Sequence, residues 1–240
     1  MTDDLEKEQF TYKSFVPYKY PYWGPFIMQA ELDDKEIKEL LDRGNRMREM
    51  DLNYTEQLAG DLDNEYYYVD VESWFPQLFG KYIDAYIDGL MNLWQVPIGE
   101  GSNPSHAADE DKNEGLTRVG WTMHSLWINY MQARDFNPPH NHSGDLSFVI
   151  YLDVPKELKE EYDNNKHIHN NGGPGAIQFT WGEEQYLSIS NRTYFPETGM
   201  VLIFPAWLKH FVIGYRSEVE RVSVSGNIHL NVTHRARRGI

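Results

Sequence analysis

The chain has 240 residues, of which 40% are hydrophobic and 14% aromatic, the composition of a folded globular protein. Its formal net charge of −15 disfavours nucleic acid and anionic lipid as general partners, because both are negatively charged themselves. Cysteine is absent, which excludes disulfides, thiolate metal ligands and a cysteine nucleophile.

The first residues lack the basic and apolar regions of a secretory signal peptide. No apolar run in the sequence is long enough to span a bilayer. We therefore expect a soluble, intracellular and cytoplasmic protein that does not associate with membranes.

Helices are predicted in the first part of the chain, after an N-terminal segment over residues 11–30 that is rich in Tyr, Phe and Pro. This segment is expected to be extended and partly buried. Asp33 and Glu36 have the spacing of a helix capping box, and apolar residues follow at helical intervals. The pattern predicts a helix over residues 33–49.

A second helix is predicted from a stripe of aromatic and aliphatic residues between Phe79 and Trp94, which recur at steps of three and four. Ser73 and Pro76 mark its start. Such a stripe is far more often a core-facing surface than a ligand site. We therefore expect this helix to cover the core.

Residues 99–116 are polar, acidic and rich in helix breakers, which predicts a long loop. The simplest interpretation is a solvated insertion, and the functional alternative is a mobile flap over a site. From residue 117 onward, short apolar runs alternate with turn residues, which predicts strands. The predicted strands lie at residues 121–131, 146–152, 176–181, 200–204, 210–213 and 221–225.

Many short strands with such turns indicate a β-sandwich or jelly roll, a mainly β fold with flanking helices (α+β). The helical part should pack on the outside of one sheet. We predict one domain over residues 1–240. It would consist of a helical support (1–98), the acidic loop (99–116) and a jelly-roll core (117–231).

The strongest candidates for a metal site are His140 and His142, which are two residues apart. Alternate side chains of an extended chain point to the same side, and the two prolines before His140 favour an extended chain. Neutral imidazole suits iron, zinc, copper and nickel. Two exposed loop histidines are the alternative for the pair alone. The other histidines, including His124, His167, His169 and His229, are expected to be exposed or structural.

Residues further along strengthen the metal hypothesis. If the segment after His210 formed a hairpin centred between Tyr215 and Arg216, His210 and Arg221 would be cross-strand neighbours. Arg221 could then bind a carboxylate bidentately, and Ser223 would share its face. A one-residue slip of the register would break this arrangement.

The order of these motifs resembles the Fe(II)- and 2-oxoglutarate-dependent oxygenases. It is closest to the bacterial and phage oxygenases with an Asn-x-x-His-x-His motif. The matching pieces span residues 120–230 and include Asn129, His140, His142, His210 and the Arg221-Val-Ser223 motif. The resemblance implies a double-stranded β-helix (jelly-roll, cupin-like) core with the cofactors Fe(II) and 2-oxoglutarate.

By the same resemblance, His140 and His210 would be metal ligands, and Arg221 and Ser223 would bind the far carboxylate of 2-oxoglutarate. Asn129 is a weaker candidate for cosubstrate binding. One position departs from the family pattern, because His142 stands where an acid is usual. Either three histidines bind the metal, which we favour, or Asp145 takes the place of His142. A site that no longer works is the third option.

The implied activity is a dioxygenase that hydroxylates an unknown small molecule or protein and decarboxylates 2-oxoglutarate to succinate. Two alternatives stay open. One is a three-histidine cupin-type dioxygenase without 2-oxoglutarate, and the other is a non-catalytic jelly-roll binding module.

Overall fold

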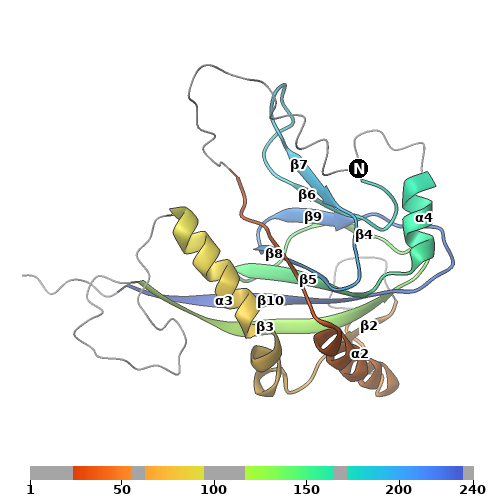
Figure 1. Ribbon diagram of the computed structural model, residues 1–240, viewed down its shortest axis with the longest axis horizontal. Coiled ribbons are helices and arrows are strands. Elements are labelled where there is room, and N and C mark those ends of the chain that lie inside the picture. Colours follow the sequence, from red (N-terminus) through yellow and green to blue (C-terminus); the bar gives the residue numbers. More distant parts are fainter. Residues whose placement is uncertain (1–23, 56–62, 95–116, 165–171, 235–240) are drawn as a thin grey trace, which may run out of the picture.

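A computed structural model describes residues 24–55, 63–94, 117–164 and 172–234. Two antiparallel sheets face one another in the jelly-roll arrangement (Figure 1). The predicted mainly β fold with flanking helices is confirmed. The six-stranded sheet has the order β1-β8-β5-β10-β3-β2, and the four-stranded sheet has the order β4-β9-β6-β7.

The strands of the six-stranded sheet are β1 (Met28–Glu31), β8 (Met200–Pro205), β5 (Leu146–Asp153), β10 (Arg221–His234), β3 (Thr117–Met131) and β2 (Glu65–Tyr67). Those of the four-stranded sheet are β4 (Asn137–His140), β9 (Lys209–Val212), β6 (Ile177–Thr180) and β7 (Asn191–Tyr194). The helices are α2 (Asp34–Glu49), the 3-10 turn η2 (Val71–Ser73), α3 (Phe75–Trp94) and α4 (Lys156–Asn164). No helix in these ranges combines the length and apolar character that a membrane crossing needs.

Helix α2 begins as its sequence predicts. The Asp33 side chain accepts hydrogen bonds from the backbone N–H groups of Lys35 and Glu36, and the Glu36 carboxylate accepts one from the backbone of Asp33. This reciprocal pattern satisfies donors that the first turn of a helix leaves free. The capping-box prediction is therefore confirmed.

Helices α2 and α3 cover the face of the six-stranded sheet that points away from the small sheet. The rings of Phe75 and Phe79 lie 5.6 and 4.8 Å from the ring of Phe148 on β5, measured between centroids. These three side chains are at most 1% exposed. The aromatic stripe of α3 is a core surface, as predicted.

The predicted hairpin between β9 and β10 is wrong. β9 pairs with β4 and β6 in the small sheet, whereas β10 pairs with β3 and β5 in the large one. The connection is fastened to helix α4, where the Glu161 carboxylate accepts hydrogen bonds from the backbone N–H groups of Arg216 and Ser217. The chain therefore passes from one sheet to the other at this point instead of folding back on itself.

Five elements were not predicted, namely β2, β4, β7, η2 and α4, and β1 lies at the end of a segment that was expected only to be extended. The N-terminal segment over residues 11–30 falls partly outside the described residues, and the acidic loop over 99–116 falls outside them entirely. His106, His167 and His169 also lie outside them.

Gly144, in the turn between β4 and β5, has a φ of +99°, a conformation that side chains rarely adopt. A Cβ atom there would lie 3.0 Å from the carbonyl oxygen of Ile228. We expect Gly144→Ala to lower the free energy of unfolding by roughly 1–3 kcal/mol in urea titrations. Gly120→Ala is the matched control, because a Cβ atom at Gly120 meets nothing within 4 Å. Equal losses in both variants would contradict the argument.

Candidate metal and cosubstrate site

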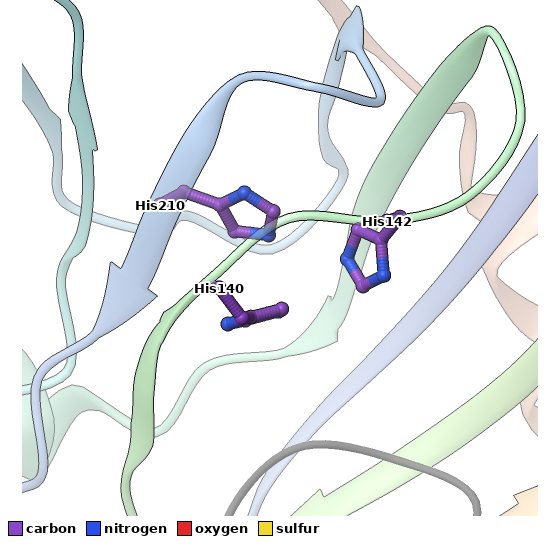
Figure 2. A group of neighbouring side chains, drawn as sticks. All are labelled: His140, His142 and His210. Carbon is purple, nitrogen blue, oxygen red and sulfur yellow. The ribbon is translucent and has the colours of Figure 1, made fainter.

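Three histidines converge at one end of the small sheet (Figure 2). His140 at the end of β4 is the direct cross-strand partner of His210 on β9, and their ring centroids are 4.4 Å apart. His142 lies two residues beyond β4, where its backbone N–H donates to the carbonyl of Ala206. One ring nitrogen from each residue lies within 4.8 Å of the others. The side chains of His140 and His142 thus point to the same side, as predicted.

Hydrogen bonds define which ring nitrogens are free. The Nδ1 atom of His140 lies 2.7 Å from the carbonyl oxygen of Pro138, and Nδ1 of His210 lies 2.9 Å from that of Leu208. A carbonyl can only accept, so Nδ1 must carry the proton in both rings. The Nε2 atom of each ring then keeps its lone pair for a metal ion.

Burial keeps these imidazoles neutral. Desolvation is the main cause that lowers the pKa of His142 to about 3, and the neighbouring His210 and His140 add to it. Desolvation, followed by His140, lowers the pKa of His210 to about 4, and desolvation also lowers the pKa of His140. At neutral pH the three rings are therefore unprotonated, as metal binding requires.

A buried arginine faces the same pocket from the opposite sheet. Arg221 at the start of β10 is 3% exposed, and its Nη1 atom donates to the carbonyl of Gly175 over 2.9 Å. Its guanidinium lies 5.3 Å from the centre of the Tyr151 ring. The Nε atom of Arg221 and the hydroxyl of Tyr151 have no hydrogen-bond partner among the described residues. Among the described residues, no carboxylate forms an ion pair with this arginine.

These unpaired groups fit an anionic ligand. A guanidinium buried without a counter-charge costs several kcal/mol, so an anion that pairs with it is strongly favoured. Ser223, two residues from Arg221, is 2% exposed and lines the same pocket. The predicted neighbourhood of His210, Arg221 and Ser223 is thus present, although it arises between facing sheets and not within a hairpin.

Comparisons with known proteins agree with this geometry. A family described as "Putative 2OG-Fe(II) oxygenase" matches residues 125–227. This range includes the three histidines, Arg221 and Ser223. The match covers less than half of the chain and, together with the geometry of the site, indicates a 2-oxoglutarate- and Fe(II)-dependent oxygenase. Its cofactors are Fe(II) and 2-oxoglutarate, and it uses dioxygen.

Solved structures are similar to this chain at low sequence identity. A prolyl-4-hydroxylase from Pseudomonas putida is 12% identical, with 89% of this chain and 93% of that chain covered and a TM-score of 0.50. A prolyl hydroxylase from Trichoplax adhaerens is 11% identical, with 85% of this chain and 82% of that chain covered and a TM-score of 0.48. No curated protein sequence matches the oxygenase.

Asp145, the alternative metal ligand suggested by the sequence, lies in different surroundings from the three histidines. The carboxylate of Asp145 accepts a hydrogen bond from the backbone N–H of Leu230 over 2.8 Å and lies 3.7 Å from Nδ1 of His229. It is not part of the histidine cluster. This placement gives no support to Asp145 as the alternative metal ligand.

Asn129 lines the pocket, but its amide is engaged within the protein. Its Oδ1 atom accepts from the indole of Trp127, and its Nδ2 atom donates to the Ser223 carbonyl and the Ser225 hydroxyl. Its amide thus ties β3 to β10.

Sequence reasoning missed several residues that line the pocket, among them Tyr151, Asn137 and Glu65. Tyr151 stands in a correctly predicted strand, and only the order of the strands shows that it neighbours Ser223. Asn137 has a buried Oδ1 atom without a partner. Glu65 belongs to β2, whose short sequence gave no strand signal.

Proposed function

We propose that this oxygenase hydroxylates an organic substrate, with His140, His142 and His210 holding Fe(II) and with Arg221 and Ser223 binding the far carboxylate of 2-oxoglutarate. The convergence of the three imidazoles opposite an unpaired buried guanidinium is the observation that supports this best. Fe(II) together with 2-oxoglutarate supplies the activation of dioxygen, with release of succinate and carbon dioxide.

The residues of the chain orient the reactants. Arg221 offers a planar set of donors that matches a carboxylate, and its contact with Tyr151 holds that plane in place. The free hydroxyls of Tyr151 and Ser223 are further donors to the same anion. Phe204 and Phe179 pack around His210, with ring centroids 4.9 and 5.7 Å from it, and keep water away from this side of the cluster.

We also infer that residues 1–240 form one oxygenase domain, with a helical support before residue 99 and a jelly-roll core from 117 to 231. Helices α2 and α3 share one apolar core with the large sheet, and that core includes Leu40, Ile83, Ile128 and Val224. A sheet that buries its outer face against these helices depends on them for stability.

The test is turnover by the purified, iron-loaded protein, measured as succinate formed from 2-oxoglutarate in air and under argon. Succinate should form only in air. With redox-inert Mn(II) in place of iron, 2-oxoglutarate at about 100 times its dissociation constant should raise the melting temperature by about 5–10 °C. Absence of both effects would refute the proposal.

A further inference from the structure

A buried acid faces the same pocket and has no role in metal or cosubstrate binding. Glu65 on β2 is 2% exposed and lines the pocket with Asn129 and Arg221. Its carboxyl group forms no hydrogen bond or ion pair with any described residue. A charged group in this state is costly to bury, which is why such acids are rare without a partner.

The position of Glu65 follows from the register of the large sheet. Glu65 pairs with Asn129, Asn129 with Ser223, and Ser223 with Tyr151, so these four side chains form one row across β2, β3, β10 and β5. Directly opposed residues share a face of the sheet. The row is therefore a polar floor of the pocket, opposite the histidines of the small sheet.

The two ends of this floor carry opposite charges. Arg221 lies against Tyr151 at the β5 end, where it can hold the anionic cosubstrate. Glu65 lies on the edge strand β2, two strand spacings from Ser223, which is roughly 10 Å at about 4.8 Å per strand. Among the described residues Glu65 interacts with no cation, Arg221 included, so its carboxyl group keeps its capacity to bind another ligand.

We propose that Glu65 is a substrate-recognition residue, which binds an ammonium or guanidinium group of the substrate. The inference rests on the proposed function, because it assigns the second ligand of that same pocket. A cation supplies the missing counter-charge, and both groups can donate several hydrogen bonds to one carboxylate. The net charge of −15 also attracts cations to the protein over long distances.

The electrostatics around Glu65 favour a bound cation over an unpaired carboxylate. Burial, followed by the nearby acid Asp135, raises the pKa of Glu65 to about 8. Both causes act against the charged form, and a bound cation would reverse their effect. A neutral substrate that accepts a hydrogen bond from the protonated acid is the competing possibility, which the choice of probes below separates.

The experiment uses the protein loaded with Mn(II) and 2-oxoglutarate, and four probes of similar size. Two are cations, n-butylammonium and n-butylguanidinium, and two are neutral, n-butanol and n-butylurea. Calorimetry should show the cations binding about tenfold or more tightly than the neutral probes, the effect of one charge-assisted hydrogen-bonded pair. The preference should disappear in Glu65→Gln and persist in Glu184→Gln, an exposed control acid.

Equal binding of cations and neutral probes, a preference that survives in Glu65→Gln, or no binding of any probe would each overturn the inference. Glu65→Met, which has a similar volume, is the second variant if Glu65→Gln does not fold.

The affinity for 2-oxoglutarate is measured on the same samples and should change less than about threefold in either variant, because Glu65 lies away from Arg221. If the wild type fails to bind 2-oxoglutarate, the proposed function fails. If it binds 2-oxoglutarate but does not discriminate the probes, only this inference fails.

Discussion

Replacing His142 with alanine should weaken the binding of Fe(II) or Mn(II) by at least about 100-fold, because even second-sphere changes cost 10- to 100-fold in metal affinity. One ring nitrogen from each of His140, His142 and His210 lies within 4.8 Å of the others, so each residue would supply one of three protein ligands. Calorimetric titration of the metal-free protein measures the loss directly. His142 lies outside the strands, so its truncation disturbs the core less than truncation of His210 would.

Two further variants decide between the ligand sets. His142→Asp restores the usual pattern of two histidines and one carboxylate and should keep tight metal binding. Asp145→Asn removes the charge of the alternative ligand but keeps an oxygen that can accept the hydrogen bond from Leu230. It should leave metal affinity within about threefold of the wild type. Loss of binding in Asp145→Asn with retention in His142→Ala would show that Asp145 is the third ligand.

Replacing Arg221 with alanine should weaken 2-oxoglutarate binding by roughly 30- to 5,000-fold, which corresponds to the 2–5 kcal/mol typical of losing one partner of a buried charge pair. The cause is that the guanidinium of Arg221 is a buried cation that faces this pocket from the large sheet, and its Nε atom has no hydrogen-bond partner in the described part of the chain. Metal affinity should change little, because the histidines belong to the opposite sheet. Calorimetry with Mn(II)-loaded protein measures both constants.

Arg221→Lys separates the effect of the charge of Arg221 from the effect of its planar set of donors. It keeps the charge but loses the planar set of donors, so it should recover only part of the affinity. Arg134→Ala controls for loss of a cation elsewhere, since Arg134 forms an exposed ion pair with Glu218. Unchanged 2-oxoglutarate affinity in Arg221→Ala would show that other residues hold the cosubstrate.

Local signals in the sequence predicted most of the regular elements. The capping box at Asp33 and the apolar stripe of α3 determine their helices through contacts within one or two turns. The long apolar strands β5 and β8 were equally clear, because both are buried along nearly their whole length. Such features depend on neighbours in the sequence and can therefore be read from it.

Pairing between distant segments could not be predicted in the same way. The hairpin argument placed Arg221 beside His210 because it assumed that consecutive strands pair. In this fold the chain crosses to the other sheet between them, held by Glu161 of a helix that was not predicted. Glu65 was missed for a similar reason, since its burial depends on pairing with Asn129, which lies far along the chain. The convergence of His140 and His142 could be read from the sequence because the two are local neighbours.

The division of the site between two sheets has a mechanical consequence. His140 and His210 stand on the small sheet, and Arg221 and Ser223 stand on the large one. The two sheets are held apart by an apolar layer that includes Phe179 from the small sheet and Leu202 and Phe204 from the large one. The thickness of this layer therefore sets the span that a chelating cosubstrate must bridge. Interior side chains that touch no reactant can thus tune the reach of the active site.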